Sequence, residues 1–78
     1  MSHNLAELLP MPAYQQQRPH LFPSVDSLRW FIRQHHAELV EARALLLPAR
    51  RRLIDPARFD AYVAEEGARR AAARVRGR

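Results

Sequence analysis

Arginine side chains are the groups in this sequence whose type and spacing best suit them to bind a partner. All 13 basic residues are arginines, set against 8 acidic residues, and the formal net charge is +5 at pH 7. Residues 1–48 contain as many acids as bases, so residues 49–78 carry the whole excess. Guanidinium groups stay charged and favour flat, bidentate acceptors such as phosphate and guanine. The sequence therefore predicts binding to a polyanion.

Two arginine clusters stand out in the second half. One is the triplet Arg50-Arg51-Arg52, which lies between aliphatic residues, and the other is the terminal stretch 69–78, which has arginines and no acid. A charge run is more often a plain solvated face than a binding site. The gathering of arginines at two places, with the acids elsewhere, favours binding over that alternative.

Polar residues upstream of the triplet extend the set of candidate contacts. The candidate DNA-binding residues are Arg29, Arg33, Gln34, His35, His36, Arg43, Arg50, Arg51 and Arg52. The auxiliary candidates, for DNA contact or self-association, are Arg69, Arg70, Arg74 and Arg76.

Other kinds of chemistry are disfavoured by the same sequence. The absence of cysteine excludes disulfides, cysteine-ligated zinc and a thiol nucleophile. His35, His36 and Glu38 suggest a metal site, but adjacent histidines on a helix point about 100° apart, which argues against one. No nucleophile and base at a catalytic spacing and no glycine-rich phosphate loop are present. We therefore predict no enzyme activity, and no metal, cofactor or small-molecule substrate.

Two helices are predicted in the middle of the chain. Ser24 is a good N-cap, and apolar residues such as Leu28 follow it at helical spacing. A single straight helix to residue 47 would turn Arg43 toward the buried side, which is costly for an unpaired charge. We therefore expect a break near residues 35–38 and a second helix over 37–44.

A small hairpin and a last helix are predicted to follow. Short apolar runs at 45–47 and 52–54 flank a polar turn and predict two strands with an arginine tip. The alternative, a helix that continues to Leu47 with the arginines in a plain loop, stays open. Asp55-Pro56 opens the last helix, which Gly67 ends unless the alanine-rich stretch beyond it continues the helix.

The rest of the chain is predicted to be an arm and a tail around one domain. Prolines and a glutamine run interrupt residues 1–22, so we expect an extended N-terminal arm. Within it, residues 5–9 allow one apolar turn that docks on the core or on another copy. A DNA-binding domain is predicted over 23–66, and a basic extension, a helix or a tail, over 67–78. No stretch approaches the ~18 apolar residues of a membrane span and no leader is evident, so we expect a cytoplasmic, nucleoid-associated protein without membrane contact.

The order of these elements resembles a known family. The stretches Ser24 to Arg33 and Asp55 to Val63, with the arginines before Leu53-Ile54, look like the MerR-like, excisionase-type proteins of bacterial prophages and integrative elements. The resemblance covers roughly residues 22–64. It implies a mainly α, winged helix-turn-helix fold with three helices and a hairpin wing. This chain has Arg43-Ala44 where the family often has glycine after its recognition helix.

The resemblance also implies a function. Such proteins are small architectural factors that bind tandem sites on double-stranded DNA, bend it and steer a tyrosine recombinase toward excision, and several act as transcriptional regulators. In this interpretation the helix from about Ala37 enters the major groove, with the first helix as an alternative, and the triplet clamps phosphates or enters a narrow minor groove. Cooperative self-association on DNA is a further expectation. The rival hypothesis is a protein-interaction factor that uses the arm and helices and does not bind DNA.

Overall fold

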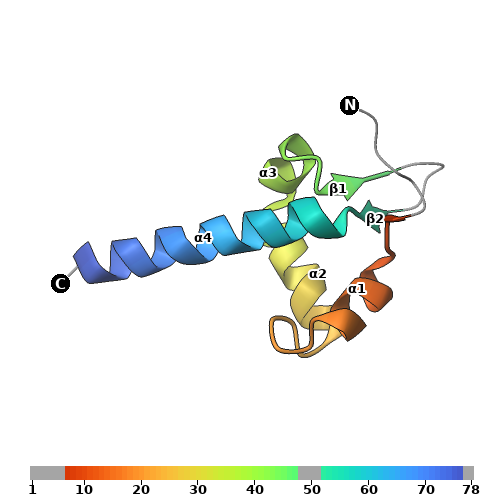
Figure 1. Cartoon of the computed structure of the whole chain (residues 1–78), viewed down its shortest axis with the longest axis horizontal. Coiled ribbons are helices and arrows are strands. Elements are labelled where there is room, and N and C mark those ends of the chain that lie inside the picture. The colour runs from red at the N-terminus through yellow and green to blue at the C-terminus, as the bar shows by residue number, and fades with distance from the viewer. Residues whose placement is uncertain (1–6, 48–51, 77–78) are drawn as a thin grey trace.

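The structure, a computed structural model, describes residues 7–47 and 52–76. Arg50 and Arg51 lie outside the described residues, as does the side chain of Arg76. Over the described ranges the chain is a mainly helical small domain with four helices and a two-stranded antiparallel hairpin (Figure 1). The elements in chain order are α1 (Met11–Gln17), α2 (Val25–Gln34), α3 (His36–Glu41), β1 (Leu45–Leu46), β2 (Leu53–Ile54) and α4 (Pro56–Arg76).

The predicted helix starts are confirmed by their caps. The hydroxyl of Ser24 accepts a hydrogen bond from the backbone N–H of Ser27 at 3.1 Å, and the hydroxyl of Ser27 accepts one from the N–H of Ser24 at 3.2 Å. This reciprocal pair satisfies amides that α2 leaves free at its first turn. At α4, the N–H of Arg58 donates to the carboxylate of Asp55 at 3.3 Å, and Pro56 occupies the first helical position.

The predicted break between α2 and α3 is confirmed at His35, whose backbone leaves the helical region at φ −122° and ψ 25°. The bend lets both helices bury apolar residues, because Leu28 and Leu39 are each fully buried. The second helix ends earlier than the predicted residue 44. Its last residue is Glu41.

A Schellman-type turn explains this early end. The N–H of Ala44 donates to the carbonyl of Leu39 at 3.0 Å, and the N–H of Arg43 donates to the carbonyl of Val40 at 3.0 Å. Arg43 takes the left-handed conformation at φ 60°, which glycine usually occupies at this position. The arginine therefore adopts a backbone conformation that glycine would favour.

The hairpin is confirmed over the alternative of a continuous helix. Leu45 pairs with Ile54 and Leu46 with Leu53 in antiparallel register. On the other edge of β2, Leu9 and Ile54 exchange two backbone hydrogen bonds of 2.9 and 2.7 Å. The N-terminal segment thus covers an edge that would otherwise be open.

The prediction of an extended N-terminal arm is wrong for residues 8–22. A proline in the first turn of α1 is compatible with a helix start, because the N–H that proline lacks has no helical partner there. Tyr14 is fully buried and Phe22 is 6% exposed. Both rings pack on Phe59 of α4, with ring centroids 4.8 and 6.2 Å apart. The segment is part of the core, and α1 adds a fourth helix to the three predicted.

Phe59 lies at the centre of a core to which all the elements contribute. Leu28 and Ile32 of α2 and Ile54 of β2 are also buried there. On α4, Phe59 and Tyr62 are both buried, three residues apart on the inward side of the helix. The buried cluster comprises Tyr14, Phe22, Leu28, Ile32, Leu39, Ala44, Leu45, Ile54, Phe59 and Tyr62.

The last helix continues through Gly67 to Arg76, and its distal half projects beyond the body of the domain (Figure 1). Residues 67–75 are all exposed. Glu66 supports this continuation, since it pairs with Arg69 at 2.6 Å and Arg70 at 3.1 Å. Among the described residues, no helix is long and apolar enough to cross a membrane.

The left-handed turn predicts a stabilising substitution. Arg43→Gly removes the steric cost of a Cβ atom at positive φ, and we expect the free energy of unfolding to rise by up to about 1 kcal/mol. Chemical denaturation measures this value. Arg43→Val should lower it, because a β-branched side chain fits this conformation worst. Unfolding at the same denaturant concentration in all three proteins would contradict the assigned conformation.

Gly67 predicts a local effect on α4. A Cβ atom added there meets nothing within 4 Å, so Gly67→Ala costs no contact. Alanine should stabilise the distal half of the helix by up to about 1 kcal/mol. Hydrogen exchange of the amides after residue 67 should slow, and helical circular dichroism should rise. Ala68→Gly is the matched control and should have the opposite effect, so unchanged exchange in both variants would contradict a continuous helix.

Candidate nucleic-acid interface

The exposed side of α2 carries polar and aromatic residues in a continuous strip. Leu28 and Ile32 face the core, which turns Arg29, Trp30 and Arg33 to solvent. Gln34 is exposed at the end of the same helix. The apolar spacing that folds α2 onto the core therefore also fixes which residues are available to a partner.

Four of the predicted site residues come together around one hollow. Arg29 and Arg33 of α2, His36 at the start of α3 and Arg52 just before β2 line a hollow of about 370 Å³. Ile32, which is 1% exposed, forms its apolar floor. Residues from three segments thus form one basic surface. We call Arg29, Arg33, His36 and Arg52 the basic surface below.

The charge of the basic surface is largely uncompensated. Arg29 forms an ion pair with Asp26 at 2.7 Å, but the carboxylate side chain is 89% exposed, and such pairs contribute little. Within residues 7–47 and 52–76, neither Arg33 nor Arg52 forms an ion pair. No acidic residue of the described part lines the hollow. The surface can therefore attract phosphate groups.

Arg43 and Gln34 do not join this hollow. Arg43 is exposed at the turn between α3 and β1. Arg69, Arg70 and Arg74 are exposed along the projecting half of α4. The predicted site is therefore divided between the basic surface and the end of the last helix.

His35 is directed into the domain rather than toward a partner. Its side chain is 12% exposed and its ring packs on Phe31, with centroids 4.5 Å apart. Nδ1 lies 3.0 Å from the hydroxyl of Tyr62, which donates its proton to Glu38. Burial, with the hydrogen bond to Glu38, raises the pKa of Tyr62, so this hydroxyl keeps its proton at neutral pH. His35 therefore joins the α2–α3 break to α4.

A group of metal-ligand types lies at the same place. His35, Glu38 and Glu66 bring ligand atoms within 4.8 Å of one another. Tyr62 contacts Nδ1 of His35 and the carboxylate of Glu38, and Arg69 and Arg70 bind Glu66. Nε2 of His35 is buried without a hydrogen-bond partner among the described residues. The arrangement joins α3 to α4 through Tyr62 and Glu38.

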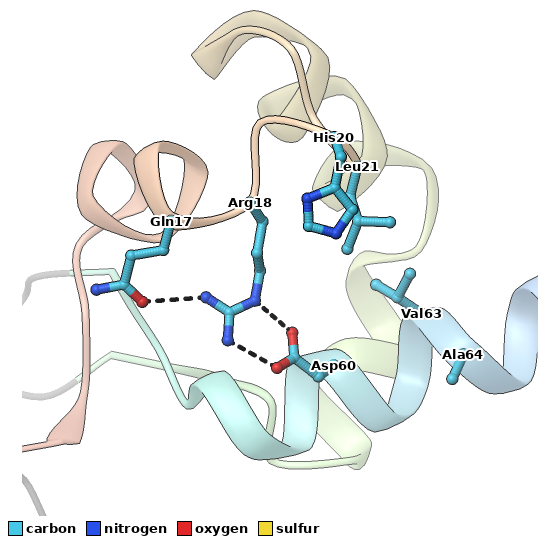
Figure 2. Close-up of a pocket in the computed structure, with 7 residues that line it drawn as sticks. All are labelled: Gln17, Arg18, His20, Leu21, Asp60, Val63 and Ala64. Atoms are coloured by element: carbon cyan, nitrogen blue, oxygen red, sulfur yellow. Dashed lines mark hydrogen bonds and ion pairs between the residues drawn. The ribbon is translucent and has the colours of Figure 1, made fainter.

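Asp60 fixes the N-terminal segment to α4. Arg18 donates two hydrogen bonds to its carboxylate, at 2.6 and 2.7 Å, and the hydroxyl of Tyr14 donates a third at 2.6 Å. Figure 2 shows the guanidinium of Arg18 meeting the carboxylate of Asp60. The pair lines a hollow of about 530 Å³ beside α1 and α4. Burial acts to raise the pKa of Asp60, but these hydrogen bonds outweigh it and hold that pKa below its ordinary value. Asp60 is therefore ionised and anchors α1, on which α2 packs.

Trp30 is a site residue that the sequence-based prediction missed. It is 55% exposed on the outer side of α2, next to Arg33 at about 100° per residue and outside the hollow that Arg29 and Arg33 line. The signal was present in the spacing, because residue 30 falls opposite the side defined by Leu28 and Ile32. An exposed tryptophan among arginines suits contact with a sugar, a base or a methyl group.

Known proteins offer no further guide to this surface. No protein-family model, curated protein or solved structure matches the chain. The chemistry of the basic surface is therefore argued from its geometry and charge.

The anchor at Asp60 predicts acid-sensitive stability. Because its pKa is lower in the folded state, its contribution is complete above the ordinary value of 3.8 and is lost as pH falls through the folded value. Asp60→Asn should lower the free energy of unfolding at pH 7 by about 1 to 2 kcal/mol, a range reduced for the partial exposure of the carboxylate. Chemical denaturation at a series of pH values measures both effects.

The variant should also lose less stability than the natural sequence on acidification. Asp26→Asn is the control, since the carboxylate of Asp26 and its ion pair with Arg29 are both exposed to solvent. We expect it to retain the acid response of the natural sequence. An Asp60→Asn protein with that same response would show that Asp60 is not the anchor.

Proposed function

We propose that this protein binds double-stranded DNA through the basic surface. The observation that carries the proposal is the convergence of Arg29, Arg33, His36 and Arg52 from three segments around one hollow without an acid. Duplex DNA carries one negative charge per ~1.7 Å of axis, so several closely spaced guanidiniums can bind it together. Arginine also forms bidentate hydrogen bonds to guanine edges in the major groove.

Within this proposal α2 is the helix that enters the major groove. Its ten residues span about 15 Å and expose Arg29, Arg33 and Gln34 on one side. The alternative, α3, has six residues and exposes Glu38 and Glu41, which phosphates would repel. The geometry therefore favours α2, the alternative of the sequence-based interpretation, over the helix near residue 37.

The hairpin acts as a wing in the same proposal. Arg52 directly precedes β2 and lines the same hollow as Arg29 and Arg33, so the start of the second hairpin strand lies beside α2. Arg50 and Arg51 precede it in sequence. Arg52, the member of the triplet that the structure describes, is suited to bind a phosphate next to the major-groove contact, and three consecutive arginines suit clamping of phosphates or entry into a narrow minor groove.

The cellular role follows from the resemblance stated for the sequence. A winged helix-turn-helix protein of the MerR-like, excisionase type would bind tandem sites, bend DNA and recruit a tyrosine recombinase. The small size of the domain and its exposed arginines are compatible with such an architectural factor. Regulation of transcription in a mobile element requires the same contacts.

A second candidate function is protein binding. Val40 and Leu47 are 48% and 68% exposed, and they line an apolar groove of about 390 Å³ between α3 and β1. An apolar groove beside a basic surface suits a protein partner recruited to DNA. Residues 8–22, which the rival hypothesis placed in an arm, bury Leu8, Tyr14 and Phe22 in the core and leave Leu21 43% exposed.

A salt titration tests the DNA proposal. Arg33→Ala with Arg52→Ala removes two uncompensated charges, so the slope of log K against log salt should fall by about 1.8 and the affinity for duplex should fall at least about tenfold. Fluorescence anisotropy with labelled duplex and excess competitor measures both. Arg58→Ala is the control, because Arg58 lies away from the basic surface and forms an ion pair with Asp55 at 3.6 Å. It should change the salt slope and the affinity by only a fraction of the effect of the double variant. A double variant that binds like the natural sequence would contradict the proposal.

A further inference from the structure

The distal half of α4, residues 67–76, buries no side chain among the described residues and so contributes little to the fold. Its side chains are exposed through residue 75, and Val75 is 76% exposed. The half projects beyond the core (Figure 1), and together with the rest of α4 it lies along the long dimension of a domain that measures 46 × 29 × 18 Å. A helix that buries so little is ordered mainly by the propensity of its alanines and arginines.

The charges of this half lie on one side of the helix. At about 100° per residue, Arg69, Arg70 and Arg74 fall within an arc of roughly 140° that also contains Ala73. The opposite arc contains the remaining alanines and Val75. A row of arginines on either side of a small residue can approach a phosphate backbone closely, because no bulky side chain keeps the helix away from it.

Glu66 orients this surface without neutralising it. Its carboxylate binds both Arg69 at 2.6 Å and Arg70 at 3.1 Å, so one negative charge meets two positive ones. Both guanidinium side chains remain 64% exposed. Within the described residues Arg74 has no ion pair. The distal half also contains no acid, so its potential is positive along its length.

We propose that the distal half of α4 is a second duplex-binding element, which contacts the phosphates that flank the DNA held by the basic surface. This inference rests on the proposed function and adds a separate contact to it. Ten helical residues span about 15 Å, which corresponds to about four base pairs of duplex. The element extends the footprint on one side and contributes affinity without reading the sequence.

The test uses charge removal with a matched control on the same helix. Arg69→Gln, Arg70→Gln and Arg74→Gln together preserve helix propensity and remove three charges. The control, Ala68→Gln, Ala71→Gln and Ala72→Gln, places three glutamines on the opposite side and keeps the arginines. Circular dichroism establishes that both variants remain helical, and anisotropy with a long duplex at several salt concentrations measures binding.

The arginine variant should lower the slope of log K against log salt by about 2.7, and the control should leave it unchanged. The natural protein should also lose affinity when the duplex is shortened by about four base pairs beside a site recovered by selection, while the arginine variant should be insensitive. Unchanged slope and length dependence in the arginine variant would overturn the inference and assign these arginines to another protein or to solvent. Failure of the natural protein to bind any duplex at low salt would overturn the proposed function and this inference together.

Discussion

The arrangement of the helices depends on the hydrogen bonds that the carboxylate of Asp60 accepts. This carboxylate accepts hydrogen bonds from Arg18 and Tyr14, which lie 42 and 46 residues earlier in the chain. These bonds hold α1 and the turn after it against α4, and α2 packs on α1. The Asp60 contact therefore helps to orient α2 through α1, and with it the exposed side of α2 that carries Arg29 and Arg33. An anchor that shares no residue with the basic surface thus helps to set the geometry of that surface.

Local signals predicted the elements whose ends are determined by their own residues. Ser24 and Asp55-Pro56 mark helix starts by capping chemistry that acts within three residues. The break near residue 35 followed from the cost of burying a charge. The hairpin followed from two short apolar runs that flank a polar turn. Each of these predictions needs only neighbouring residues, which is why the sequence sufficed.

Long-range contacts account for what the sequence did not predict. A seven-residue helix has little stability of its own, so α1 exists because Tyr14 packs on Phe59 and bonds to Asp60. The inward position of His35 depends on Tyr62, 27 residues later, in the same way. Neither pairing has a signature in composition or spacing. The sequence accordingly predicted the residues of the basic surface, but it did not predict which of the candidate residues lie together.

Whether an arginine forms an ion pair with a carboxylate indicates its role better than whether it lies in a cluster along the sequence. Arg18 is 18% exposed and holds Asp60, so its charge serves the fold. Arg58 has Asp55 three residues before it and is partly compensated. Arg33 and Arg52 have no such ion pair in the described part of the chain, and both line one hollow. A guanidinium held near others without a carboxylate raises the electrostatic energy of the folded domain, and an anionic partner relieves that cost. A bound phosphate would recover the free energy that the domain loses by gathering these charges, so the unpaired arginines support the proposed polyanion partner more directly than net charge does.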